Sequence, residues 1–179
     1  DPTHAPPEEA AESGKEPWQT VRDEIADLPP LEAGESCDDL PFDGHRARNH
    51  RKSTVEFIQK IPDDGGSRTD LSEEEQLECH KRLDSKTSAG NIYGRMSWEE
   101  PAPTLTTRCT SPSSGRFVHP EQDRGITPRE AARLMTFPHE YVLPDSNSAA
   151  ERLIGNAVPP RFIQSVVGRF LDEHAHLIG

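Results

Sequence analysis

The clearest hydrophobic pattern in the chain lies near its C-terminal end. After Pro160, apolar side chains recur at helical spacing, at Ile163, Val166, Val167, Phe170 and Leu171. This spacing predicts a helix with a wide apolar stripe along one face. So small a chain offers no obvious internal partner for the stripe, and the pattern therefore also predicts a surface outside it on which the helix packs.

Two further helices are predicted from the residues at their starts. The segment Thr127-Pro128-Arg129-Glu130 supplies an N-cap hydroxyl, a proline in the first turn and a reciprocal carboxylate, for a helix that runs to about Phe137. Thr20 is placed to cap a shorter helix over residues 20–28, which Pro29 then ends. Both predictions rest on local chemistry.

The middle of the chain gives weaker signals. Capping-box motifs begin at Ser53 and Ser72, each with Glu three residues later. They predict helices that run to about Ile61 and Leu83. Residues 84–94 resemble a loop. Short β-branched or apolar runs between turn-forming residues predict two strands, Thr104–Thr107 and Phe117–Val118.

Composition separates the acidic start of the chain from the rest. Only 31% of the 179 residues are apolar, so one compact core covering every residue is not expected. Residues 1–43 contain 13 acidic and two basic residues, whereas residues 44–179 contain 19 acidic and 18 basic residues. The acidity argues against nucleic-acid binding by the first segment, and its Pro, Glu and Ala content predicts a disordered linker over residues 1–19.

The cysteines and the hydropathy exclude several protein classes. The three cysteines, Cys37, Cys79 and Cys109, are widely spaced and form no Cys-x-x-Cys motif. A disulfide framework or a zinc site is therefore not expected, and a reducing cytoplasmic compartment fits better. The sequence shows no signal peptide and no apolar run of membrane-spanning length. Because the first residue is Asp1 and not Met, we expect a cut or processed chain.

One segment carries candidate chemistry: Ile154-Gly155-Asn156-Ala157-Val158-Pro159-Pro160. It predicts a tight loop that feeds a helix, because Gly155 permits unusual backbone angles and the prolines preset the helix start. Asn156 and the main-chain N–H groups of such a loop can face a small polar ligand. The alternative reading is a helix-capping loop that binds no ligand.

Five short segments of the sequence, the last of them this loop, resemble in their composition and order the C-terminal end of bacterial DNA (cytosine-5) methyltransferases. The segments span Tyr93–Trp98, Pro101–Thr106, Gly115–Pro120, Arg124–Pro138 and Ile154–Pro160. The second and the last resemble the family's ninth and tenth motifs. The resemblance implies an α/β fold: the C-terminal part of an S-adenosylmethionine-dependent methyltransferase, with a small mixed α+β recognition domain and helices that return to a large sheet domain missing from this chain.

The resemblance also implies how the chain is divided and which residues meet the cofactor. Residues 20–43 would form a connecting helix and loop, residues 44–97 the target-recognition domain, and residues 98–179 the ninth and tenth motifs with the C-terminal helices. S-adenosylmethionine would be the methyl donor, with one wall of its pocket formed by Gly155, Asn156, Ala157 and Val158. No catalytic residue is expected here, because the family's Pro-Cys-Gln nucleophile motif is absent from the sequence.

Double-stranded DNA is the implied partner, together with a catalytic N-terminal half that lies upstream in the same chain or on a separate subunit. Because arginine and lysine reach phosphates and guanine edges, the candidates for DNA binding are Arg95, Arg46, Arg48, Arg51, Lys81, Arg82, Arg108 and Arg116. Arg95 is the foremost of these, and a solvated surface or ion pairs are the alternative roles. Arg124, Arg129 and Glu130 are expected to be structural.

The function implied is DNA cytosine-5 methylation in a bacterial cytoplasm, with this chain inactive alone. Three alternatives remain open. The first is a recognition subunit of a split methyltransferase, and the second is part of a tRNA cytosine-5 methyltransferase. The third is an interaction protein with a degenerate methyltransferase end. The well-developed region 44–92 favours DNA over tRNA, and the intact Gly155-Asn156 loop argues against the third.

Overall fold

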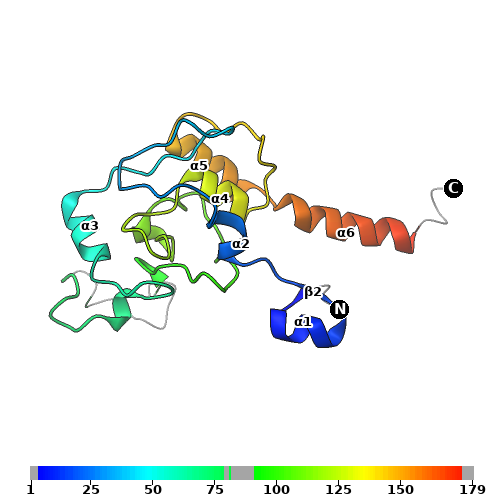
Figure 1. Cartoon of the computed structure of the whole chain (residues 1–179), viewed down its shortest axis with the longest axis horizontal. Coiled ribbons are helices and arrows are strands. Elements are labelled where there is room, and N and C mark those ends of the chain that lie inside the picture. Colours follow the sequence, from blue (N-terminus) through cyan, green and yellow to red (C-terminus); the bar gives the residue numbers. More distant parts are fainter. Residues whose placement is uncertain (1–3, 79–80, 82–90, 175–179) are drawn as a thin grey trace.

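A computed structural model describes residues 4–78, 81 and 91–174 (Figure 1). Three helices, α2 (Val21–Ile25), α4 (Pro128–Leu134) and α5 (Asn147–Asn156), lie together in the central body, and long irregular segments wrap around them. Helix α3 (Lys52–Ile58) lies at one side of this body, and helix α6 (Pro160–Glu173) projects from the other.

The acidic N-terminal segment carries regular structure, which corrects the prediction of disorder for residues 4–17. The elements of this segment are β1 (His4–Ala5), α1 (Pro7–Ser13) and β2 (Glu16–Pro17), with the two short strands parallel. Glu8 and Glu9 lie in the first turn of α1, where the helix dipole favours acidic residues, and Gly14, with a φ of 66°, ends the helix in the left-handed conformation.

The two strongest helix starts are confirmed. The Thr20 side chain accepts from the main-chain N–H of Asp23, whose carboxylate accepts in return from the Thr20 N–H. Thr127 and Glu130 make the same reciprocal pair at the start of α4. Each box satisfies main-chain donors that the first helical turn leaves without partners, so the local signal is sufficient to place both helices.

The weaker signals fare less well. Helix α3 begins at Lys52 with Arg51 as an N-cap that makes no side-chain bond, so the predicted capping role of Ser53 is wrong. Glu75 does accept from both the N–H and the hydroxyl of Ser72, but the segment forms a turn and not a helix over the residues described. The described residues also include the 3-10 helices η1 (Arg68–Asp70) and η3 (Pro112–Ser114).

Strand structure is sparse in the described part of the chain. Residues 104–107 form no strand, which corrects that prediction; the prolines at 101 and 103 remove main-chain donors just before them. Val118 makes single-residue bridges with Arg95 and Gly125. In place of a long β-ladder, isolated main-chain hydrogen bonds, such as that from the Met96 N–H to the Val118 carbonyl at 2.9 Å, join the irregular segments together with side-chain contacts. The chain is a small mixed α/β structure.

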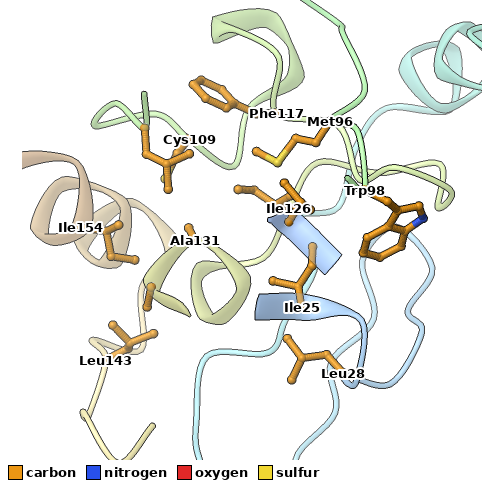
Figure 2. Packing of buried hydrophobic residues seen from close by; sticks show 13 residues of the cluster. Ile25, Leu28, Met96, Trp98, Cys109, Phe117, Ile126, Ala131, Leu143 and Ile154 are labelled. Atoms are coloured by element: carbon orange, nitrogen blue, oxygen red, sulfur yellow. The ribbon is translucent and has the colours of Figure 1, made fainter. Parts of the chain in front are cut away.

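The main hydrophobic core joins segments that lie far apart in the sequence (Figure 2). Val21 and Ile25 of α2 pack toward Ala131 of α4 and Ile154 of α5, and Met96, Phe117 and Ile126 come from the irregular segments. The remaining buried members are Leu28, Trp98, Leu105, Cys109, Ala132 and Leu143. A second, smaller cluster of Phe57, Ile61 and Leu71 lies beside α3.

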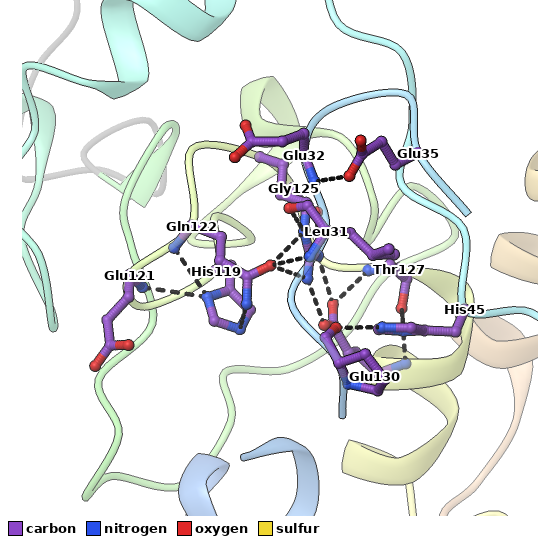
Figure 3. Close-up of polar contacts among 12 residues, drawn as sticks. Leu31, Glu32, Glu35, His45, His119, Glu121, Gln122, Gly125, Thr127 and Glu130 are labelled. Atoms are coloured by element: carbon purple, nitrogen blue, oxygen red, sulfur yellow. Dashed lines mark hydrogen bonds and ion pairs between the residues drawn. The ribbon is translucent and has the colours of Figure 1, made fainter. Parts of the chain in front are cut away.

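Buried arginines connect the loops to this core. Arg124 is fully buried and donates to Glu130, to the side chain of Gln122 and to the carbonyl oxygen of Leu31. Figure 3 shows Leu31, Gln122 and Glu130, to which Arg124 donates, beside His45, whose ring lies against Thr127. Arg124 and Glu130 are therefore structural, as the sequence predicts.

Arg129 is the second of these anchors. Its guanidinium donates to Asp43 and to the carbonyl oxygens of His139 and Tyr141. It lies 5.2 Å from the ring centroid of Phe42, within the range of a cation–π contact. The loop around residue 43 is thus fixed to the segment that follows α4, and the structural role predicted for Arg129 is confirmed.

Candidate functional site

The candidate cofactor segment spans the end of α5 and the turn into α6. Gly155 and Asn156 are the last residues of α5, so the prediction of a loop at these positions is wrong. Gly155 is not among the described glycines with a positive φ. Its role is close approach, because a Cβ at this position would lie 2.3 Å from the carbonyl carbon of Thr106 and from the main-chain nitrogen of Thr107.

This close approach fixes the segment of residues 104–108 against the end of α5. Two backbones meet where any larger residue would separate them. Replacing Gly155 with alanine is therefore expected to lower the free energy of unfolding by about 2 kcal/mol, the usual cost of overpacking. Urea unfolding measures the change. Gly168→Ala is the matched control, because a Cβ there meets nothing within 4 Å, and equal losses in the two variants would contradict the close-contact argument.

The residues after Gly155 form an open surface. Asn156 and Val158 are exposed, Val158 with 54% of its area, and the Ala157 N–H is used by the carbonyl of Ile154. An amide beside an exposed apolar side chain suits one wall of a site for a small organic ligand that has polar and apolar parts. The described residues do not enclose such a ligand, so a second wall has to come from elsewhere.

The apolar stripe of α6 lies next to this surface and is exposed, as the sequence pattern implies. Phe162, Ile163, Val166, Val167, Phe170 and Leu171 each keep between 44% and 60% of their area accessible. Figure 1 shows the helix extending away from the central body. A contiguous apolar face of this kind is typical of a surface that packs against another domain or chain.

Arg95, the foremost DNA candidate, is buried, and this corrects its predicted role. Only 1% of its area is accessible. Its guanidinium donates to the carbonyls of Ile61, His119 and Gln122 at 3.2, 3.1 and 2.9 Å, and it is paired with Asp123. Because its donors are already used inside the protein, Arg95 fixes the smaller cluster to the core and does not face DNA.

Three other candidates are partly buried and bonded within the chain. Arg116 donates to the carbonyls of Gly65 and Arg95 at 2.7 and 2.8 Å. Arg46 donates to the side chain of Asn147, and Arg48 forms an ion pair with buried Glu151. These contacts support the structural alternative for Arg46 and Arg116, while Arg48 retains 36% side-chain exposure.

The remaining candidates are exposed where the structure describes them. Arg51 and Arg108 are open to solvent, and Lys81 is paired with Glu78. Arg82 lies outside the described residues. Sequence reasoning missed Arg152, an exposed residue of α5 that lies near Arg108 in one pocket. The helix itself was not predicted, and the sequence around Arg152 gave no other signal.

Two cysteines, Cys37 and Cys109, lie in the described part of the chain. Cys109 is fully buried, and burial raises the pKa of its thiol to about 12. Cys37 is half-buried, and Cys79 lies outside the described residues. Over the described ranges, no group of three or more His, Cys, Asp or Glu side chains is placed to hold a metal ion. In the same part of the chain, no helix has the length and apolar character needed to cross a membrane.

Comparison with known proteins assigns the chain to a family. A model of the C-5 cytosine-specific DNA methylase family matches residues 7–171. The chain belongs to the C-5 cytosine-specific DNA methylase family. The match includes α5, α6 as far as residue 171 and the segments that pack on α5, so the resemblance read from the five sequence segments is confirmed at the level of the family.

Individual relatives agree with this methylase assignment. The type II methylase M.HgiDII of Herpetosiphon aurantiacus is 40% identical over 96% of this chain, and the match covers 47% of that protein. The type II methyltransferase M1.BsuMI of Bacillus subtilis is 41% identical over 51% of the chain and 21% of its own length. DNA (cytosine-5)-methyltransferase 3 of Arabidopsis thaliana is 32% identical over 88% of the chain and 13% of its own length. The chain thus spans about half or less of these relatives.

Proposed function

We propose that this chain supplies the DNA-recognition region and one wall of the S-adenosylmethionine pocket of a bacterial DNA (cytosine-5) methyltransferase. The observation that carries the proposal is the family match over residues 7–171 in a sequence without the Pro-Cys-Gln motif. The domain division proposed from the sequence applies here: recognition by residues 44–97, and the cofactor side within residues 98–179.

For the cofactor, the proposal assigns Gly155, Asn156, Ala157 and Val158 to one wall of the pocket. S-adenosylmethionine, when bound, supplies the methyl group. The exposed Asn156 amide offers a donor and an acceptor to polar groups of a ligand, and the exposed Val158 offers an apolar contact. Gly155 acts indirectly, since its contact with Thr106 and Thr107 positions the end of α5.

The remaining wall and the nucleophile would come from a polypeptide segment absent from this chain. The exposed stripe of α6 begins directly after the proposed cofactor residues, so a domain that packs on α6 would also reach the open side of the pocket. A flipped cytosine requires an attacking thiolate, and the pKa of Cys109, raised to about 12, makes that buried thiol unsuitable.

For recognition, the proposal assigns contact with duplex DNA to the exposed candidates Arg51, Lys81 and Arg108, and leaves Arg95 as an internal anchor. Arg95 donates to the carbonyl of Ile61 in the proposed recognition region and to those of His119 and Gln122 in the cofactor-side segment. It therefore holds the two parts together. A rigid link of this kind would keep bound DNA in register with the active site.

Methyl transfer tests the proposed function. The 179-residue chain is incubated with duplex DNA and labelled S-adenosylmethionine, alone and together with the polypeptide from its own genome that carries Pro-Cys-Gln and a glycine-rich cofactor loop. That polypeptide is sought first in the coding DNA upstream of Asp1 and then in the neighbouring gene. We expect no methylation by the chain alone and 5-methylcytosine from the completed protein.

A charged variant makes the test sharper. Val166→Asp with Phe170→Asp is expected to abolish methylation by the completed protein, because the stripe could no longer pack on an apolar surface. The control replaces two polar residues of the same helix, Gln164→Asp with Ser165→Asp, which adds the same charge outside the apolar stripe. Methylation by the 179-residue chain alone, or a completed protein that modifies tRNA in preference to DNA, would reject the proposal.

A further inference from the structure

Arg48, Thr107, Arg108, Ser148, Glu151 and Arg152 line a surface pocket of about 280 Å³ at the base of α5. They come from three parts of the sequence: the start of the recognition region, the segment after residue 104, and α5 itself. Since a water molecule takes up roughly 30 Å³ in the liquid, the pocket has room for a phosphate group with some water.

The pocket carries an excess of positive charge. Of its three arginines, Arg48 is paired with Glu151, which is only 3% exposed and also accepts from the hydroxyl of Thr110. For Arg108 and Arg152 the described part of the chain offers no ion-pair or hydrogen-bond partner to the guanidinium, and both residues are exposed. Two cations are therefore available to a ligand, in a chain whose formal net charge is -12.

The pocket is also built rigidly. The close contact of Gly155 with Thr106 and Thr107 fixes the segment that carries Arg108 against the helix that carries Arg152. The ion pair of Arg48 with buried Glu151 fixes the third side. The two available guanidinium groups thus start from backbones whose separation is already set, which lowers the entropic cost of holding one ligand between them.

We propose that this pocket binds a phosphodiester group of the duplex DNA backbone, held by Arg108 and Arg152. The inference rests on the proposed function and adds a specific site to it. Arginine matches the geometry of phosphate oxygens, and the hydroxyls of Thr107 and Ser148 are additional donors. An exposed site with two available cations suits a polyanion better than a small ligand with a single carboxylate.

The pocket lies close to the residues proposed for the cofactor wall. Arg152 lies four residues before Asn156 on α5, so the two side chains lie on the same face of the helix, one turn apart. A phosphate held by Arg152 would place the DNA backbone beside the wall proposed for S-adenosylmethionine. The contact would fix the position of the strand without reading its sequence.

The salt dependence of DNA binding tests the site. The protein that carries this chain in its full natural length is titrated with a fluorescent duplex at several salt concentrations, as wild type, Arg108→Ala, Arg152→Ala and the double variant. Each lost phosphate contact is expected to reduce the salt slope by about 0.9 and to weaken binding roughly tenfold at 0.1 M salt. The double variant should combine both losses for every duplex sequence.

Arg22→Ala is the matched control, because Arg22 is an exposed arginine on α2, paired with Glu99, outside the pocket. Salt slopes of the pocket variants equal to that of Arg22→Ala, with tight DNA binding by the wild type, would overturn the site and leave the proposed function standing. A wild type without salt-dependent DNA binding would reject both.

Two further arms separate DNA from other oxyanions. Inorganic phosphate at equal ionic strength should not displace the duplex better than chloride does; if it does so in the wild type and not in the double variant, the site takes free phosphate and the proposal is wrong. Weaker binding of S-adenosylmethionine by the double variant, with DNA affinity unchanged, would assign the pocket to the cofactor carboxylate and would equally overturn it.

Discussion

Replacing Glu130 with alanine is expected to lower the free energy of unfolding by about 3–5 kcal/mol, which is a large part of the stability of a small domain. Glu130 is 1% exposed and forms two bonds with Arg124, of 2.9 and 2.7 Å, while also accepting from the Thr127 N–H. The substitution leaves a fully buried arginine without its counter-charge and removes the reciprocal cap of α4.

The pKa of Glu130 agrees with this role. Burial by itself raises the pKa of the carboxyl group, but the charge and hydrogen bonds of Arg124 outweigh burial and lower it to about 2. Urea unfolding followed by circular dichroism measures the loss. Glu56→Ala is the control, because it removes an exposed pair with Lys52 worth less than about 1 kcal/mol. A Glu130 loss no larger than the control would refute the argument.

Acidification from pH 6.5 to pH 4 is expected to lower the free energy of unfolding by about 3 kcal/mol through His119 alone. Burial lowers the pKa of His119 from 6.5 to about 4. Its Nδ1 accepts from the main-chain N–H groups of Glu121 and Gln122, at 3.2 and 3.1 Å, which a protonated Nδ1 could not do (Figure 3). The folded protein therefore holds this ring neutral.

The direction of the effect follows from where the proton binds. Between pH 6.5 and pH 4 the unfolded chain protonates His119 and the folded chain does not, so unfolding takes up a proton and stability falls as the pH falls. Burial also lowers the pKa of His45 and His50, which adds to the loss in the same direction. Above pH 6.5 the contribution of these groups to the slope fades, because the unfolded chain also loses its histidine protons there.

Urea midpoints measured at intervals between pH 7.5 and pH 4 give the test. His119→Gln is the informative variant, because its side-chain carbonyl can accept an N–H bond without titrating, and it should show a shallower dependence on pH. A wild-type midpoint that stays constant down to pH 4.5 would show that His119 is not held neutral. A slope unchanged in His119→Gln would assign the dependence to other groups.

The features that could be read from the sequence are those that depend on neighbouring residues. The N-cap at Thr20 and the capping box at Thr127 were predicted because the groups involved lie within three residues of each other. The stripe of α6 was predicted because helical periodicity is a local pattern. Helix α5 was missed because Leu153 and Ile154 are its only large apolar residues, and the rest are small or polar, with Gly155 near its end.

The role of Arg95 could not be read in the same way. Its acceptors lie 24 to 37 residues away in the sequence, and only the fold brings them to the guanidinium. An isolated arginine in a basic protein segment is equally suited to DNA or to the interior, and burial decides between the two. The reason given for a glycine at position 155 was wrong, since close packing with Thr106 explains it and backbone angle does not.

The arginine anchors have a consequence for how such a domain can change over evolution. Arg95 and Arg129 hold loops largely through main-chain carbonyl oxygens, those of Ile61 and Tyr141 among them, and Arg124 also donates to the carbonyl of Leu31. Every amino acid offers the same carbonyl, so the loop residues at these contacts can be exchanged while the bond remains. A domain fastened in this manner can change the surface that its loops present by substitution, while its framework stays the same.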